Sequence, residues 1–221
     1  MPWHEITQSD GFLWDFDGTF MDTETHHFRS YLEVFGTWGH TMEKAYYFQS
    51  FTQEGEGAAR EIAKAGLPTT SAEIASLKDR AYLRIIQQTP PLPFAHTQAL
   101  TAAMVALGKR VAIASNSSEG VIREILGPHP GLLGVLSLIQ GKEPRLQKKP
   151  APDLFLAAAA HLGLKRPIVL EDSSRGLLAA AAAGFPAFFL RTPDNEGLHT
   201  PGPRLASVTH GELLEMLGRV D

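Results

Sequence analysis

Two aspartates placed two positions apart mark the first point where this chain can do chemistry. The segment Asp15-Phe16-Asp17-Gly18-Thr19 directly follows the apolar run 11–14 near the N-terminus. Side chains at i and i+2 of a strand point to the same side, and the Gly-Thr behind them opens a turn with free backbone N–H groups. Such a place can hold a metal ion and a phosphoryl group. The same residues also suit a plain strand-ending turn, so the motif alone leaves both interpretations open.

Three further polar segments occur downstream in a fixed order. They are Ser115-Asn116-Ser117 after the apolar run 110–114, Lys149-Pro150-Ala151-Pro152-Asp153 before a helical stretch, and Glu171-Asp172-Ser173-Ser174 after the run 167–170. Each has an ordinary structural explanation, as a helix cap or as a solvated charge at a helix start. In an open parallel sheet, however, the carboxyl ends of the strands converge on one crevice. The four motifs together therefore predict one shared site.

These four motifs resemble those of the haloacid dehalogenase-like phosphohydrolase superfamily in order and in approximate spacing. The resemblance covers essentially the whole chain. The forms Lys-Pro-x-Pro-Asp and Glu-Asp-Ser are similar to those of the branch that holds β-phosphoglucomutase and phosphoglycolate phosphatase. The resemblance implies these roles: Asp15 as nucleophile, Asp17 as general acid/base, Ser115 and Lys149 as phosphate ligands, and Asp172 as a magnesium ligand.

The chemistry of phosphate transfer agrees with these residue types. An attacking carboxylate forms an aspartyl phosphate, and it must stay ionised beside an incoming dianion. Mg²⁺ bound by Asp15 and Asp172 offsets this crowding of negative charge, so Mg²⁺ is the expected cofactor. The resemblance adds the backbone carbonyl of Asp17 as a metal ligand, and Glu171 is expected to hold a metal-bound water.

The expected phosphate-binding groups are Ser115, Asn116, Lys149 and the backbone N–H groups of residues 16–18, the last of which is Gly18. Asp17 is placed to protonate the leaving alcohol and then to take a proton from the attacking water. The dehalogenases that attack carbon and the phosphonate-cleaving enzymes resemble this chain elsewhere but lack an acid at that position. Phosphoryl transfer is therefore favoured.

The alternation of segments predicts an α/β fold, with a Rossmann-like parallel sheet core and an inserted all-helical cap domain. Strand-like runs at 11–15, 110–114, 135–139, 167–171 and 186–190 alternate after residue 95 with alanine-rich helical stretches. The segment 23–92 contains no strand-like run and shows helical patterns at 25–35, 42–48, 57–65 and 71–88. We expect residues 1–22 and 93–221 to form the catalytic core, and residues 23–92 to form a lid over Asp15.

Four residues of the predicted lid are candidates for substrate contact, namely His27, Thr52, Gln53 and Lys78. His27 matches in position a histidine near the active site of β-phosphoglucomutase-like proteins, and a half-exposed helix histidine is an equally good interpretation. The mutase pattern expects an arginine near Gln53, which this sequence lacks. The lid sequence thus favours phosphate hydrolysis over a phosphomutase reaction.

Composition excludes several other classes. The 221 residues are 43% hydrophobic and 20% charged, which suits an ordinary globular enzyme, and the absence of cysteine fits a reducing compartment. No segment resembles a secretory signal or a membrane span, so we expect a cytoplasmic protein without a membrane partner. A net charge of −4 without a basic block argues against nucleic acid. We expect a monomer or a weak homo-oligomer.

The sequence therefore predicts a Mg²⁺-dependent phosphatase that hydrolyses a small phosphorylated metabolite, of the sugar- or polyol-phosphate kind, through an aspartyl phosphate. A β-phosphoglucomutase-like phosphomutase shares every core residue and is the alternative enzyme. A catalytically idle binding protein on the same scaffold is the alternative from another class.

Overall fold

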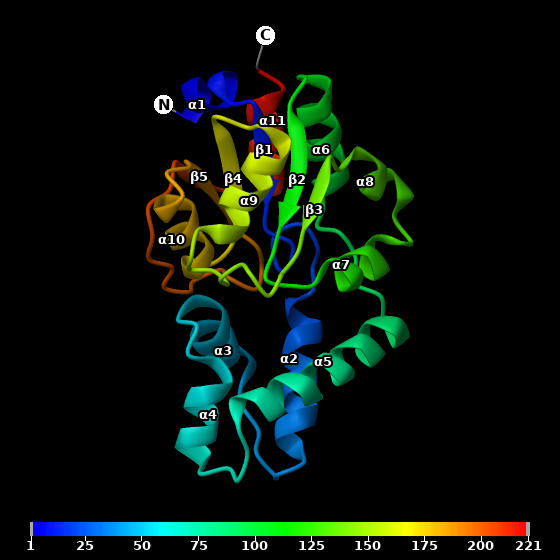
Figure 1. The fold of residues 1–221 in the computed structure, drawn as a ribbon, viewed down its shortest axis with the longest axis vertical. Helices are drawn as coiled ribbons and strands as arrows, with labels where there is room; N and C mark the ends of the chain where they lie inside the picture. The colour runs from blue at the N-terminus through cyan, green and yellow to red at the C-terminus, as the bar shows by residue number, and fades with distance from the viewer. Residues whose placement is uncertain (1, 220–221) are drawn as a thin grey trace.

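A six-stranded parallel sheet forms the centre of the protein in the computed structural model, which describes residues 2–219 (Figure 1). The strands are β1 Gly11–Trp14, β2 Arg110–Ala114, β3 Leu138–Gln140, β4 Pro167–Glu171, β5 Ala187–Leu190 and β6 Ala206–Val208. Their order across the sheet is β3-β2-β1-β4-β5-β6, and all neighbouring pairs are parallel. The order reverses between β1 and β4, where α/β folds form their crevice. The predicted Rossmann-like core is confirmed.

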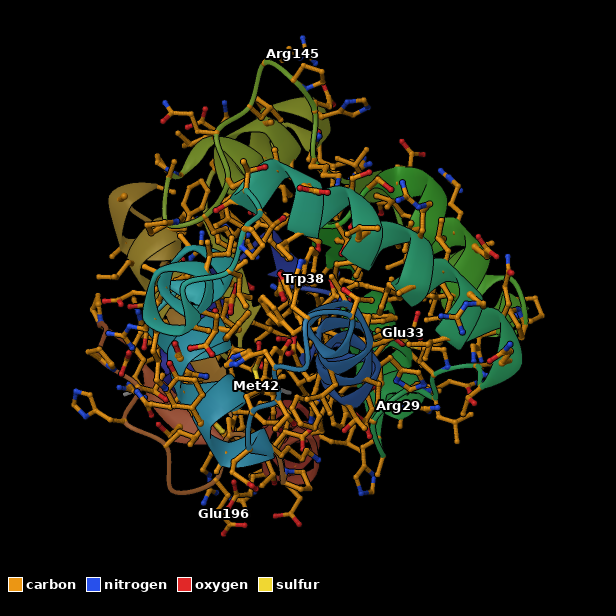
Figure 2. All side chains as sticks on the ribbon, turned by 90° about the horizontal axis from the view of Figure 1, so that it is seen from below. Arg29, Glu33, Trp38, Met42, Arg145 and Glu196 are labelled. Atoms are coloured by element: carbon orange, nitrogen blue, oxygen red, sulfur yellow. The ribbon has the colours of Figure 1, made fainter. Side chains whose placement is uncertain are left out.

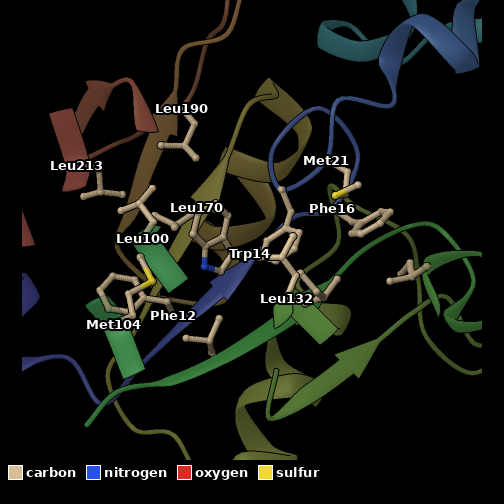
Figure 3. Packing of buried hydrophobic residues seen from close by; sticks show 14 of the residues in the cluster. Phe12, Trp14, Phe16, Met21, Leu100, Met104, Leu132, Leu170, Leu190 and Leu213 are labelled. Atoms are coloured by element: carbon tan, nitrogen blue, oxygen red, sulfur yellow. The ribbon is translucent and has the colours of Figure 1, made fainter. Parts of the chain in front are cut away.

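Alternate residues of the strands pack on two different helical layers. Phe12 and Trp14 belong to a large cluster of aromatic and branched side chains (Figure 3), whereas Leu13 lies in a cluster with Ala112 and Ala114 on the opposite face. The first face is covered by α1 Pro2–Gln8, α6 Thr97–Ala106, α7 Glu119–Leu126, α8 Pro130–Val135 and α11 His210–Leu217, and the second by α9 Asp153–Leu162 and α10 Ser174–Ala182. Small side chains on both partners let α9 and α10 lie close to the sheet.

The helices between β1 and α6 form a second, smaller cluster beyond the carboxyl ends of the strands (Figure 1). They are α2 Glu24–Gly36, α3 Lys44–Tyr47, the π-helix η1 Phe48–Gln53, α4 Gly57–Ala65 and α5 Ser71–Gln88. Their shared core contains Phe35, Tyr47, Phe51 and Ile74. Seen from below, these helices cover the sheet edge, with Trp38 and Met42 in the middle of the view (Figure 2). We call residues 23–92 the cap, and their boundaries as a domain stay a prediction.

The two segments that join the cap to the sheet layers run side by side. Met21 forms an isolated antiparallel bridge with Pro93, and the Asp22 N–H donates to the Leu92 carbonyl at 2.9 Å. The chain therefore enters and leaves the cap at neighbouring points.

Short elements near the ends of the sheet differ from the sequence prediction. The third strand was expected over 135–139 but begins only at Leu138, because the helix that starts at Pro130 continues to Val135. The sequence patterns also missed β6, which has three residues, and α11, whose first turn is fixed by a capping box between Thr209 and Glu212. Elements this short carry too few periods to stand out from loops.

Among the residues that the structure describes, no helix combines the length and the apolar character that crossing a bilayer requires.

Candidate active site

Asp15 and Lys149 meet where β1 ends. The Asp15 N–H continues the sheet by donating to the Leu170 carbonyl at 2.9 Å, which places its side chain at the crevice. Lys149 Nζ lies 2.5 Å from Asp15 Oδ1 and 2.7 Å from Glu171 Oε1, and the lysine is only 3% exposed. Burial alone would lower the pKa of Lys149, but the two carboxylates outweigh it and raise the pKa. Lys149 is therefore a fixed cation between two acids.

Asp172 joins the two carboxylates that contact this lysine in a group of three acids. Oxygens of Asp15, Glu171 and Asp172 all lie within 4.8 Å of one another. Burial, reinforced by the neighbouring carboxylates and opposed by Lys149, raises the pKa of Asp15 to about 7. Burial together with Glu171 and Asp15 also raises the pKa of Asp172 well above its usual range. Lys149 pairs with Asp15 and Glu171 only, so the group keeps an excess of negative charge. Hard carboxylate oxygens at this spacing are the ligands that a divalent cation such as Mg²⁺ prefers. The donor set therefore fits a metal ion.

Glu171 is locked in place by the loop that follows β4. Its Oε2 accepts hydrogen bonds from the Asp172 N–H at 3.0 Å and from the Ser173 N–H and hydroxyl at 3.1 and 2.9 Å. A Cβ on Gly176 would come within 1.7 Å of Glu171 Oε1, so only glycine leaves room for this carboxylate. Glu171 is thus fixed by three hydrogen bonds at Oε2 and by Lys149 at Oε1.

Asp17 points away from this group and toward hydrogen-bond donors. Its Oδ1 accepts from the Thr23 hydroxyl at 2.8 Å and lies 3.0 Å from His27 Nε2, and its Oδ2 accepts from the Ser117 hydroxyl at 2.6 Å. Burial would raise the pKa of Asp17, but His27 and the two hydroxyls hold it well below its usual range. The sequence predicts the Asp15 and Asp17 side chains on the same side of the chain. In the structure, the turn after β1 places them in different surroundings. The Asp17 side chain does not join the carboxylate group of Asp15, Glu171 and Asp172.

Gly18 has a different part from the expected one. Its N–H donates to the Met21 carbonyl at 3.0 Å and so is not free for a phosphate. At a φ of +74°, a Cβ on Gly18 would lie 2.4 Å from Asp172 Oδ2. The glycine therefore permits the close approach of the β1 turn to Asp172, which Thr19 then holds through a hydroxyl hydrogen bond of 2.8 Å.

The segment after β2 divides its side chains between two tasks. Ser115 is buried and lines the cavity beside Asp17, and its Oγ accepts from the Ser117 N–H at 3.0 Å. Asn116 Oδ1 accepts from the Lys149 N–H at 3.0 Å, so this amide positions the lysine segment. The Ser117 hydroxyl donates to Asp17 Oδ2 at 2.6 Å, and the Ser115 hydroxyl donates to the same oxygen at 3.4 Å. The i, i+2 spacing from Ser115 was the signal that could have identified Ser117.

A cavity of about 530 Å³ opens between these residues and the cap. From the cap it is lined by His27, Thr52 and Lys78, and their contact with substrate stays a prediction. His27 stacks on Tyr82 with ring centroids 4.0 Å apart, and Lys78 Nζ lies 4.5 Å from the centre of the same ring. Burial lowers the pKa of Lys78. The cation and the rings give the cavity a mixed polar and aromatic roof.

Gln53, the fourth cap residue expected to contact substrate, lies elsewhere. It is 3% exposed and does not line this cavity; its amide instead contacts the Asp172 carbonyl and the first residues of α10. The π-helical turn η1 directs the side chain at the sheet layer, and sequence periodicity gives no sign of a π-helix.

The sequence patterns did not single out several other residues that line the cavity, among them Glu24 and Arg175. Glu24 begins α2 at the cavity wall, and burial raises its pKa to about 8, with Asp17 adding to the effect. Arg175 reaches the cavity from the start of α10 and donates to the Lys149 carbonyl. Its position directly after Glu-Asp-Ser-Ser was the available signal.

Comparison with known proteins agrees with this geometry. The family profile described as haloacid dehalogenase-like hydrolase matches residues 10–184. The chain is 29% identical over 189 residues to fructose-1-phosphate phosphatase YqaB of Escherichia coli, with 82% of this chain and 96% of the relative covered. It is 30% identical over 185 residues to protein CbbY of Rhodobacter capsulatus, with 78% and 81% covered.

The fold has solved counterparts. The crystal structure of CbbY from Rhodobacter sphaeroides in complex with phosphate superposes with a TM-score of 0.77 at 23% sequence identity, covering 96% of this chain and all of that one. The match over most of the chain, together with the four motifs gathered at one sheet edge, establishes that the protein belongs to the haloacid dehalogenase-like hydrolase family and is a phosphohydrolase of that family.

Proposed function

We propose that the protein is a Mg²⁺-dependent phosphatase for a small phosphorylated metabolite and that it works through an aspartyl phosphate on Asp15. The observation that carries this proposal is the buried group of three carboxylates with Lys149 at the end of β1. Asp15 and Asp172 would hold the metal ion, with the Asp17 backbone carbonyl as a further ligand. When bound, Mg²⁺ supplies the positive charge that lets an anionic phosphate approach a carboxylate.

Asp15 is the nucleophile in this proposal. A carboxylate oxygen attacks phosphorus, the bond to the leaving alcohol breaks, and the phosphoryl group is transferred to Asp15. Lys149 contacts Asp15 directly and stabilises the negative charge of the transferred group as a point charge. Ser115 lies beside it as a hydroxyl donor to the phosphoryl oxygens.

Asp17 moves the protons. Its low pKa keeps it ionised in the resting site, so it acts directly as the base that takes a proton from the attacking water. A phosphate dianion that enters the cavity raises the pKa of Asp17 by like-charge repulsion, so Asp17 takes up a proton from solvent as the substrate binds and gives it to the leaving alcohol. Water then attacks the phosphorus of the aspartyl phosphate, the bond to Asp15 breaks, and inorganic phosphate leaves while Asp17 takes the proton of that water. His27, bound to Asp17 and stacked on Tyr82, keeps this carboxylate oriented.

The cap supports hydrolysis of a monophosphate with a polar, uncharged leaving group. A phosphomutase has to hold a second phosphate while the first is transferred, which requires strong cationic contacts in the cap. Among the cap residues that line the cavity, Lys78 is the cation, and its ammonium lies over aromatic rings. The name of the Escherichia coli relative, a fructose-1-phosphate phosphatase, supports a sugar or polyol phosphate. We also propose that residues 23–92 act as a lid that excludes water, and that the enzyme works in the cytoplasm.

Activity on p-nitrophenyl phosphate with and without Mg²⁺ separates an active enzyme from an idle binding protein, and a panel of phosphorylated sugars and polyols then identifies the substrate. Glucose 1-phosphate with a trace of the 1,6-bisphosphate tests the mutase alternative. We expect release of inorganic phosphate. Rapid formation of glucose 6-phosphate without phosphate release would overturn the hydrolase assignment.

A further inference from the structure

The cap and the sheet layer are joined by one buried amide in the part of the chain that the structure describes. Thr23 and His27 of the cap are also buried, and both contact Asp17. Three further polar bridges between cap and sheet layer are exposed or half-exposed: Lys44 with Asp194, Asp79 with Lys142, and Gln87 with Glu124. Gln53 differs from them because it is 3% exposed and lies against the loop that carries Asp172. A buried amide at a contact between two layers has to be fully hydrogen-bonded, and its partners show what it holds.

Both ends of the Gln53 amide are used. Nε2 donates to the Asp172 carbonyl at 3.2 Å, and Oε1 accepts from the Ser174 N–H at 3.0 Å and from the Ser174 hydroxyl at 3.3 Å. The amide therefore spans the peptide groups on both sides of Ser173, in the turn between β4 and α10. This turn places the Asp172 carboxylate among its neighbours.

Thr19 holds the Asp172 carboxylate from the sheet layer, but the sheet layer's hydrogen bond to the Asp172 backbone carbonyl is longer than the one from the cap. On that side the same carbonyl has the Asn195 Nδ2 at 3.4 Å, and Asn195 also donates to the Leu190 carbonyl at 2.9 Å. When the cap moves away, the Asp172 carbonyl loses its shorter hydrogen bond and the Ser174 N–H loses its acceptor. The geometry of the Asp172 turn is therefore complete only with the cap in place.

The backbone beside Gln53 is built for this close approach. Gly55 follows η1 at a φ of +74°, and a Cβ there would lie 2.5 Å from Arg175 Cδ. Glycine thus lets the cap backbone lie directly on the Arg175 side chain, which brings Gln53 within reach of the turn. The same close approach offers a way to disturb the contact without changing Gln53.

We propose that Gln53 is a positioning residue that couples closure of the cap to the arrangement of Asp172, and that it does not bind substrate. This rests on the proposed function for its effect on the rate, because Asp172 matters there as a metal ligand. Groups that orient a metal ligand without touching the metal typically change metal affinity or activity by ~10- to 100-fold. A closed cap then gives a site ready for Mg²⁺, and an open cap gives a looser one.

The test compares Gln53→Met with Gln87→Met. Methionine keeps the length of the side chain and removes every hydrogen bond, and Gln87 is a matched control, a cap glutamine that bridges to the sheet layer far from Asp172. For Gln53→Met we expect the apparent Mg²⁺ dissociation constant, measured by thermal shift, to rise ~10-fold. We expect kcat on p-nitrophenyl phosphate to fall by a similar factor with little change in KM. Gln87→Met should match the wild type in all three quantities.

A raised KM with an unchanged Mg²⁺ constant would show that Gln53 binds substrate, and wild-type values throughout would also overturn the proposal. Gly55→Ala should repeat the Gln53→Met effect with the amide still present. If neither variant folds, hydrogen exchange on the wild type decides, because the Ser174 amide should exchange more slowly when Mg²⁺ and inorganic phosphate are added, and unchanged exchange would contradict the coupling. Lack of any phosphatase activity in the wild type would refute the proposed function alone, since the thermal shift needs no turnover.

Discussion

Two buried carboxylate clusters in this protein have opposite electrostatics. In the cap, Glu61 is 1% exposed and accepts from the Tyr46 hydroxyl at 2.5 Å, with His40 Nε2 2.7 Å away. Burial would raise the pKa of Glu61, but these two hydrogen bonds outweigh it and lower the pKa. At the sheet edge, burial wins, and the pKa values of Asp15 and Asp172 are raised.

The difference lies in the ratio of acids to donors. One carboxylate with two donors is a satisfied structural link, which here ties α4 to α3 through Tyr46 and to the segment before α3 through His40. Three neighbouring carboxylates, two of which share one lysine, leave an excess of buried negative charge, and this donor set fits a cation. An excess of buried charge therefore distinguishes the candidate active site from a structural link, whereas burial of a carboxylate alone does not. Substitutions in the two clusters should therefore have opposite effects.

The largest effect is expected for Asp15→Asn. The variant keeps the shape of the side chain but cannot attack phosphorus, so activity should fall by about 10⁴-fold or more. Its metal-free form should be at least as stable as the wild type, because the change removes one of the crowded charges. Steady-state rates and thermal unfolding check the two parts. Aspartyl phosphate trapped on another residue would refute the assignment.

Asp17→Asn should slow both proton transfers, by about 10²- to 10⁴-fold. In its surroundings Asp17 resembles Glu61 more than Asp15, since donors surround it and lower its pKa. The variant should therefore lose stability as well as rate, in contrast to Asp15→Asn. Rates on p-nitrophenyl phosphate and melting temperatures measure this contrast. An undiminished rate would remove Asp17 from the proton-transfer role.

Asp172→Asn tests the need for a cation directly. Mg²⁺ at one hundred times its dissociation constant should stabilise the wild type by ~2.7 kcal/mol. The variant should lose most of that response while its metal-free form unfolds no earlier than the wild type. Melting temperatures with and without Mg²⁺ give both the stabilisation by the metal and the stability of the metal-free form. A response that survives in the variant would locate the metal elsewhere.

Glu61→Gln should do the reverse. The buried link loses its charge, at a cost of about 1–3 kcal/mol, or about 2–12 °C in melting temperature, without a change in the Mg²⁺ response. A carboxyl group with a lowered pKa stabilises the fold above its ordinary pKa of 4.5, and the contribution disappears as the pH falls through the folded value. The gap between wild type and variant should therefore be present at pH 7 and close in acid. A gap that grows in acid would contradict the pKa direction.

The smallest effect is expected at an exposed pair. Arg123 Nε lies 2.7 Å from Glu119 Oε1 on α7, with both side chains more than half exposed. Water screens this pair, so Arg123→Ala should change the free energy of unfolding by no more than about 0.5 kcal/mol. Denaturant titration measures it. A loss comparable to that of Glu61→Gln would mean that burial does not separate the two kinds of pair.

The sequence was enough to predict the sheet core and most of the carboxylate cluster. Strand β1 and the strands β2 and β4 beside it are buried apolar runs, and the rule that parallel strands end at one edge brings Asp15, Ser115 and Asp172 together. The direction of Gln53 was beyond prediction, because it depends on a π-helical turn and on the packing of Gly55 against Arg175. The separate surroundings of Asp15 and Asp17 were missed for a similar reason, since the turn after β1 ends the alternation that the prediction assumed.

The two chain segments that join the sheet layer to the cap lie next to each other, which matters for engineering the protein. Asp22 and Leu92 are bonded neighbours, so the whole segment between them leaves the sheet layer and returns to it at one spot. No strand order or register in the sheet depends on what that segment contains. We therefore expect it to be exchangeable: a transplanted helical segment of another length, or a short closing turn, should preserve the continuity of β1 with α6 while replacing the cap side of the cavity.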